Sequence, residues 1–303
     1  MYAPNFTKIH TDGITMGTGW KPRYMDRRDY TISDPKVTRI TDKIKFAETP
    51  PVYVDKSEYF LKVKKQLDIG SCTANAGTYI AEYYQNKAFG KSIPGSRLFL
   101  YKVTRNLQRD IGDVGAYLRT TMAAIALFGI PPESYYPYIT ADYDKEPDQF
   151  VYSIADNYEA TCYFCHDPIQ DKLAGDVVIN QLKRYISAGI PSMFGFFIFP
   201  SFISGKNVHG VSNVGYIPFP GDNEDIEGGH AVTIAGYDDN CVITNGLTGE
   251  STMGAFKIIN SWGTAWGLDG YGWLPYKYVE AGLACDFWSL ISMKWLDTGK
   301  FGL

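Results

Sequence analysis

The sequence predicts an α+β fold with two lobes, with helices in the first half and strands in the second. Apolar residues recur at helical spacing between about residues 50 and 170, whereas short β-branched runs dominate after residue 190. The 303 residues are 45% hydrophobic and 20% charged, which is ordinary for a globular chain of this size. We therefore expect a helical lobe over about 50–175, a β-barrel-like sheet lobe over about 176–303, and a cleft between them.

Residues 1–48 differ in composition from the rest of the chain. They contain several glycines and basic residues, and few of their apolar residues follow a regular pattern. Trp20, Tyr24 and Tyr30 favour docking over disorder. We expect an extended N-terminal arm over 1–48 and a single two-lobed domain over 49–303. The alternative for the arm is a partly ordered tail on the surface.

The first strong helix signal begins at Ser71. Ala76, Ile80 and Tyr84 recur at four-residue steps, and Ser71 is expected to cap the helix by accepting a hydrogen bond from a first-turn N–H. Cys72 then occupies the first helical position, where the helix dipole lowers a thiol pKa and free N–H groups can bind an oxyanion. The alternative is a cysteine that only packs.

Further elements follow from periodicity and from breaking residues. Helices are expected over 96–106, 113–128 and 177–188, the second of them ending at Gly129 before Pro131 and Pro132. Strands are expected over 192–199, 231–237, 255–260, 271–274 and 287–295.

Two of these strands carry polar residues that suit catalysis. His230 follows paired glycines and opens one strand, and Asn260 ends the other. An asparagine carbonyl can fix the tautomer and tilt of an imidazole, and the indole of Trp262 can shield that bond from water. A lone histidine beside glycines is more often structural, but the order Gln66, Cys72, His230, Asn260 favours chemistry.

These residues resemble those of the papain-like cysteine peptidases, with the features of a divergent microbial or viral-type member. The matching stretches are Ile-Gly-Ser-Cys-Thr over 69–73, Gly-Gly-His-Ala-Val over 228–232, and Asn-Ser-Trp-Gly over 260–263. Trp-Gly at 266–267 and Gly-Tyr-Gly at 270–272 extend the last match. Ile69 replaces a cysteine usual in secreted members, and Thr73 replaces the usual aromatic residue.

The resemblance implies a role for each residue. Cys72 would be the nucleophile, and His230 the general base and then the general acid. Asn260 would orient His230, Gln66 would line the oxyanion hole, and Trp262 would shield the His–Asn pair. The implied fold is the papain-like one, with the active site in the cleft between the lobes.

The implied activity is hydrolysis of peptide bonds through an acyl-enzyme, with a peptide or protein substrate and with no cofactor or metal. Because relatives carry an N-terminal pro-segment, the arm would lie in the cleft and keep the chain a zymogen. Two alternatives stay open: an acyl transferase that uses the same site, and a catalytically silent binding or assembly protein. Residues 114–116 and 207–209 are candidate walls of the substrate pocket, with His209 interpreted as a surface histidine rather than as a rival base.

The net charge, the N-terminal sequence and the cysteine spacing bear on other classes of function and on location. With 29 basic and 33 acidic residues, the chain shows no basic excess that would suggest nucleic-acid binding. No secretory signal and no membrane-length apolar run is seen, so we expect an intracellular protein or one released by a signal-independent route. Cys162 to His166 has the spacing of a haem-attachment motif or half a zinc site, but structural cysteines, bonded or free, fit better because no second Cys/His pair lies nearby.

Overall fold

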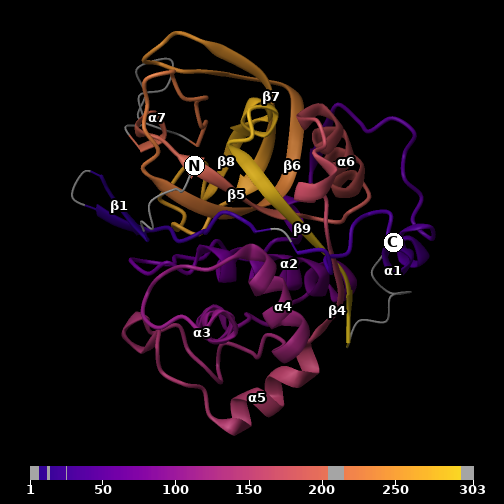
Figure 1. Ribbon diagram of the computed structural model, residues 1–303, viewed down its shortest axis with the longest axis vertical. Helices are drawn as coiled ribbons and strands as arrows, with labels where there is room; N and C mark the ends of the chain where they lie inside the picture. The colour runs from indigo at the N-terminus through magenta and orange to yellow at the C-terminus, as the bar shows by residue number, and fades with distance from the viewer. Residues whose placement is uncertain (1–6, 12–13, 25, 204–214, 295–303) are drawn as a thin grey trace.

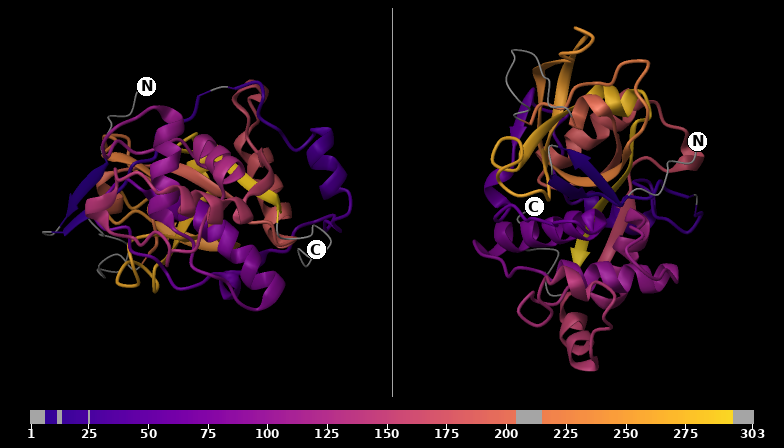
Figure 2. Two further views of the ribbon diagram at one scale, coloured as in Figure 1. Left: turned by 90° about the horizontal axis from the view of Figure 1, so that it is seen from below. Right: turned by 90° about the vertical axis from the view of Figure 1, so that its left-hand side faces the viewer.

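The structure, a computed structural model, has the α+β, two-lobed architecture that the sequence predicts. It describes residues 7–11, 14–24, 26–203 and 215–294. Helices gather in one half of the molecule and a curled antiparallel sheet fills the other (Figure 1). Two further views show the same division (Figure 2).

The helical lobe is built around α2 (Cys72–Phe89), which is buried along most of its length. Helix α2 ends at Gly90, whose φ of 65° is a left-handed conformation that glycine adopts without strain. Its neighbours are α3 (Arg97–Gln108), α4 (Leu118–Phe128) and α5 (Gln149–Ala155). Short 3₁₀ turns lie at Ser57–Tyr59, Thr140–Asp142, Asp156–Tyr158 and Ile169–Asp171.

The expected helix over 113–128 begins five residues late, at Leu118. Asp113 is committed elsewhere, since its Oδ1 accepts from Gly70 N at 2.7 Å and from the Tyr101 hydroxyl at 2.6 Å. Gly115 has a φ of 74°, which is incompatible with a right-handed helix. These interactions hold 113–117 as an extended segment beside the start of α2.

The sheet lobe holds a seven-stranded antiparallel sheet in the order β4-β9-β5-β6-β7-β8, with β3 also paired to β6. The strands are β3 (Tyr53–Asp55), β4 (Ala160–Cys165), β5 (Met193–Ile198), β6 (Gly228–Thr244), β7 (Ser251–Ile259), β8 (Tyr271–Pro275) and β9 (Ala284–Met293). Helices α6 (Gly175–Ser187), α7 (Pro200–Ile203) and α8 (Tyr276–Glu280) belong to this half. Its core is rich in aromatic residues, among them Phe194, Phe196 and Phe287.

Strand β4 corrects the expectation that residues up to about 170 are mainly helical. It lies within that range but pairs antiparallel with β9, far along the chain. Cys162 and Cys165 lie on this strand, are buried, and are free rather than bonded to each other. The short apolar run 160–165 is strand-like only because β9 supplies a partner, which local periodicity does not reveal.

The two lobes meet where α2 packs against β6. Thr233 of β6 donates a hydrogen bond to the carbonyl of Ala76 at 3.1 Å, and Tyr84 donates to the Leu290 carbonyl of β9 at 2.7 Å. One hydrophobic cluster includes residues of both lobes, such as Tyr84 and Leu290. The start of α2 and the start of β6 are thus fixed relative to each other.

The N-terminal arm carries a hairpin and a helix that the sequence pattern did not predict. Strands β1 (Lys8–Thr11) and β2 (Ile14–Gly17) form the hairpin, and α1 (Pro35–Thr41) follows, capped by the side chain of Asp34. In Figure 1 the indigo chain runs between the lobes, from β1 on one side to α1 on the other. In the described part of the chain, no helix is both long and apolar enough to span a lipid bilayer.

Candidate active site

Cys72 is the first residue of α2, as the sequence predicts, and its side chain is fully buried. Ser71 stands at the N-cap position, but its hydroxyl makes no capping bond and the expected one is absent. Instead the hydroxyl lies 2.7 Å from that of Tyr138 and accepts from Asn75 Nδ2 at 3.1 Å. Tyr138 and Asn75 therefore hold the turn that presents Cys72.

Gln66 lies on the loop before this turn, with its side chain fully buried. Its Nε2 donates to the Ile69 carbonyl at 2.9 Å, and its Oε1 accepts from the Ser261 hydroxyl. Its own carbonyl accepts from the Tyr138 hydroxyl at 2.7 Å. The side-chain amide is thus oriented by hydrogen bonds at both its nitrogen and its oxygen.

His230 and Asn260 are hydrogen-bonded across β6 and the end of β7. His230 Nε2 lies 2.7 Å from Asn260 Oδ1, and because an amide oxygen can only accept, Nε2 carries the proton. Nδ1 is buried and has no hydrogen-bond partner within the described residues, so it is free to accept a proton. Trp262 stacks on the imidazole at 4.6 Å between ring centroids and 27° between planes, which excludes water from the bond.

The fold brings the cysteine and the histidine to the same point. The backbone N–H of Ala231, the residue after His230, interacts with the Cys72 sulfur, as do the N–H groups of Thr73 and Cys72 itself. Five residues from distant parts of the sequence, namely Gln66, Cys72, His230, Asn260 and Trp262, therefore form one cluster between the lobes.

The arm covers this cluster with its backbone. Gly19 N and Trp20 N both lie 3.1 Å from the Gly229 carbonyl, next to His230. On the other side, Ala116 N donates to the Gly19 carbonyl at 2.8 Å and Lys21 N donates to the Ala116 carbonyl at 3.0 Å. The arm is thus hydrogen-bonded to both lobes at once.

Three further contacts place the arm against the proposed reacting groups. Gln66 Nε2 lies 3.4 Å from the Thr18 carbonyl, and Trp262 Nε1 donates to the Gly17 carbonyl at 2.9 Å. The Trp20 N–H is among the groups that interact with the Cys72 sulfur. Cys72 and His230 consequently have no exposed surface.

Burial in the folded chain reverses the expected electrostatics of the thiol. It raises the pKa of Cys72 to about 12, and hydrogen bonds from nearby backbone N–H groups only partly oppose the rise. Burial also lowers the pKa of His230 to about 4, against the opposing effect of Asn260. The expectation of a lowered thiol pKa is therefore wrong for the folded chain, because desolvation outweighs the hydrogen bonds from backbone N–H groups.

The side chain of Trp20 fills a pocket that the sequence did not indicate. A Cβ at Gly195 would lie 2.0 Å from the indole, and one at Gly229 would lie 2.7 Å from the Trp20 carbonyl oxygen, so both positions require glycine. Trp20 Nε1 donates to Asp286 Oδ2 at 3.0 Å. Strand β9 begins at Ala284, earlier than predicted, and so includes Asp286; a lone aspartate in a buried apolar run was the available signal for it.

The structure describes only some of the residues that were predicted to form the walls of the substrate pocket. Ala116 contacts the arm directly, and Gly115 faces it so closely that a Cβ there would lie 2.1 Å from the Gly19 carbonyl. Residues 207–209, including His209, lie outside the described residues. Across the described ranges, no cluster of three or more His, Cys, Asp or Glu side chains could hold a metal ion.

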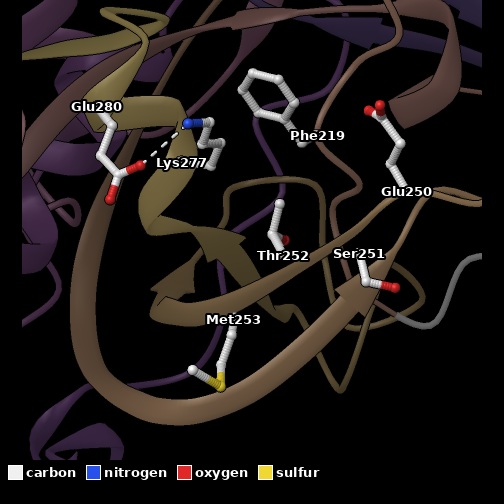
Figure 3. Close-up of a pocket in the computed structure, with 7 residues that line it drawn as sticks. All are labelled: Phe219, Glu250, Ser251, Thr252, Met253, Lys277 and Glu280. Carbon is white, nitrogen blue, oxygen red and sulfur yellow. Dashed lines mark ion pairs between the residues drawn. The ribbon is translucent and has the colours of Figure 1, made fainter.

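A separate cavity of about 460 Å³ lies at the far end of the sheet lobe (Figure 3). Phe219, Met253 and the 3.4 Å ion pair between Lys277 and Glu280 are among the groups that line it. None of the five clustered residues contributes to it, so this cavity is not the candidate active site.

Comparison with known proteins shows which family the chain resembles. Residues 51–287 match the model of the papain family cysteine proteases. The chain is 32% identical over 292 residues to an uncharacterized peptidase C1-like protein, L477, of Acanthamoeba polyphaga mimivirus, covering 92% of this chain and 88% of that protein.

Solved structures give the same result. Xylellain, a cysteine protease from Xylella fastidiosa, aligns with a TM-score of 0.71 and 30% identity, over 93% of this chain and 97% of that one. Procathepsin L2 from the larval midgut of Tenebrio molitor aligns with a TM-score of 0.60 and 20% identity, over 89% of this chain and 75% of that one, and supports the fold alone.

Proposed function

The chain belongs to the papain family of cysteine proteases, and from this premise we propose that it hydrolyses peptide bonds at Cys72, His230 and Asn260 and is held inactive by its N-terminal arm. One observation supports both parts of the proposal most strongly. Residues 17–20 lie as a peptide across the cluster, with the Thr18 carbonyl at Gln66 and the Trp20 N–H at the Cys72 sulfur.

The residues suit a two-step acyl transfer to water. His230 Nδ1 takes the proton of Cys72, and the thiolate attacks the substrate carbonyl carbon. The Cys72 backbone N–H and Gln66 Nε2 stabilise the oxyanion. The imidazolium then protonates the leaving amine, and water, deprotonated by His230, releases the carboxylic acid and restores the thiol. Asn260 keeps the imidazole oriented throughout, under the cover of Trp262.

The direction of the arm explains how it can lie there uncut. It runs from Trp262, which binds the Gly17 carbonyl, to Ala116, which pairs with Gly19 and Lys21. A substrate with its acyl side along 114–116 and its leaving amine toward His230 runs the opposite way. The arm therefore fills the site without presenting a carbonyl in the orientation that the mechanism requires.

Hydrolysis is tested with peptide substrates on the folded full-length chain, cut by a site-specific protease at a recognition sequence inserted at 47–49, where the chain is exposed. We expect cleavage only after the cut and removal of the arm, and none with Cys72→Ala. Full activity in Cys72→Ala would overturn the assignment of the nucleophile. Full activity in the uncut chain would overturn the inhibitory role of the arm.

An added amine distinguishes hydrolysis from transfer. If water is the acceptor, product masses stay those of the free acids when a primary amine is included. Accumulation of amide products at low amine concentration would instead identify an acyl transferase. A correctly folded, cut chain whose Cys72 stays unreactive at neutral pH would indicate a binding or assembly protein.

A further inference from the structure

The pocket that holds Trp20 ends in buried acidic groups. Asp286 is fully buried, and its carboxylate accepts from two indoles, Trp20 Nε1 at 3.0 Å and Trp288 Nε1 at 2.6 Å. Asp167 lies beside it, since Asp167 Oδ2 accepts from the Asp286 backbone N–H at 2.9 Å. Two carboxylates therefore share one buried region at the start of β9.

The arm itself supplies the groups that satisfy these carboxylates. Arg23 Nη1 lies 2.8 Å from Asp167 Oδ2, and the guanidinium also interacts with Asp286 through its charge. Trp20 provides the N–H for Asp286 Oδ2. Trp20 and Arg23 belong to one four-residue stretch of the arm. Both donors therefore leave the pocket when the arm leaves.

What stays behind is a cavity with negative charge, and among the residues that the structure describes no cation other than Arg23 interacts with the two carboxylates. Asp286 retains the Trp288 indole, and Asp167 retains the backbone N–H groups of Asp286 and Phe287. All of these donors are neutral. Burial raises the pKa of Asp286 to about 6, so the group carries its charge at pH 7.5 even with the arm docked. A buried charge without a partner is costly, which favours a cationic ligand.

Resting on the proposed function, we propose that the vacated Trp20 pocket selects a basic side chain, arginine above lysine, on the acyl side of the cleaved bond. Asp286 is the specificity-determining residue, and Asp167 adds to its field. Substrates of this class replace both contacts of the arm with one residue, since they supply the bulk of Trp20 and the charge of Arg23.

The shape of the pocket favours arginine. Gly195 and Gly229 leave room for a planar group as wide as an indole, and Phe197 lies 5.2 Å from the Trp20 ring, centroid to centroid. A guanidinium is planar, stacks on aromatic rings, and presents several N–H donors to carboxylates. Ala116 holds the backbone on either side of Trp20, so a substrate residue here has its main chain fixed as well.

The experiment compares arginine with citrulline, its neutral isostere, in otherwise identical peptides. Each of the three positions before the cleaved bond carries arginine, citrulline, lysine, leucine or tryptophan in turn. The folded chain is cut at 47–49 and freed of its arm. Binding to the Cys72→Ala form is measured by fluorescence anisotropy, and kcat/KM is measured with Cys72 intact.

We expect arginine to exceed citrulline at least tenfold at one position, in binding and in kcat/KM, with lysine between them. Equal values for arginine and citrulline, or a preference for leucine or tryptophan, would overturn the proposal. Arginine-selective binding without any cleavage would support the pocket and contradict the proposed hydrolysis, so the two failures are distinct.

Substitution of each buried carboxylate tests which of them produces the selectivity for arginine. In Asp286→Asn the arginine-to-citrulline ratio is expected to fall close to one, and in Asp167→Asn it falls less. Asp176→Asn, an exposed residue of α6, is the matched control and keeps the ratio. If Asp286→Asn does not fold, the arginine-to-citrulline ratio of the natural chain still tests whether the pocket selects a basic side chain. An undiminished ratio in a folded Asp286→Asn would remove Asp286 from the assignment.

Discussion

The arm docks through two regions that are held by different forces. The first, residues 17–21, here called the plug, binds through backbone hydrogen bonds to Gly229, Ala116 and Leu67 and through the single buried side chain of Trp20. The second, residues 30–46 around α1, here called the anchor, binds through apolar packing. Val37 is fully buried in a cluster with Phe164, Tyr185 and Ile291.

The difference indicates that the plug and the anchor have different roles. The backbone bonds of the plug are ones that any peptide can make, so a substrate can replace them. The packing of the anchor depends on particular side chains and does not involve the cluster around Cys72. In the zymogen that we propose, the anchor keeps the plug at high local concentration, while the plug blocks the site.

The largest expected effect comes from a substitution that fills the space occupied by the Trp20 side chain of the plug. In Gly195→Val, the added side chain would overlap the Trp20 indole, since even a Cβ would lie 2.0 Å from it. We expect plug docking to weaken by about 3 kcal/mol, the upper range of overpacking costs, or roughly 100-fold. Labelling of Cys72 by iodoacetamide in the uncut chain measures it.

The control for this substitution uses Gly195→Val and the natural chain, each cut at 47–49 and freed of the arm. Their labelling rates should agree, because neither has a plug. Slow labelling of uncut Gly195→Val, equal to that of the natural chain, would show that Trp20 does not occupy the pocket beside Gly195.

The second effect concerns pH and the buried carboxylate beneath the plug. The pKa of Asp286 is raised to about 6 in the folded chain, against an ordinary value of 3.8, so its ionisation destabilises the fold as pH rises through this window. Asp286→Asn removes that dependence. Its free energy of unfolding relative to the natural chain should increase by about 2.4 kcal/mol between pH 4 and pH 7.5.

Urea unfolding of both chains at the two pH values measures this difference. A difference that is independent of pH would mean that Asp286 ionises as easily in the folded chain as in the unfolded one. A difference that decreases with pH would mean that the carboxylate is stabilised by its neighbours.

The smallest effect separates the anchor from the plug. Val37→Ala removes apolar contacts in a fully buried position and should weaken docking of α1 by about 2 kcal/mol. Amide hydrogen exchange in Pro35–Thr41 should accelerate accordingly. Labelling of Cys72 should change far less than in Gly195→Val, and an equal increase would show that plug and anchor dock as one unit.

The sequence predicted the clustered residues well because each stands in a strong local pattern. Cys72 follows a helix-start signal, and His230 and Asn260 lie at opposite ends of predicted strands, which the fold brings to one point. The order of helices and strands likewise predicted the two lobes. The family resemblance supplied the role of each residue, which local pattern alone could not.

What the sequence could not predict depends on contacts between distant segments. Trp20 and Asp286 are 266 positions apart, and neither lies in a periodic pattern that points to the other. The late start of α4 follows from Asp113 bonding to Gly70, and β4 exists because β9 pairs with it. The raised thiol pKa likewise follows from burial by segments that are distant in the sequence rather than from the helix start.

The central claim is that the plug, and not the site itself, keeps Cys72 unreactive. It is tested most directly by measuring the alkylation rate of Cys72 by mass spectrometry in the intact chain and after a cut between Arg27 and Arg28, which are exposed and lie between plug and anchor. We predict an increase of roughly 100-fold or more on cutting and removing residues 1–27, with the anchor still in place. Equal rates before and after the cut would contradict the account.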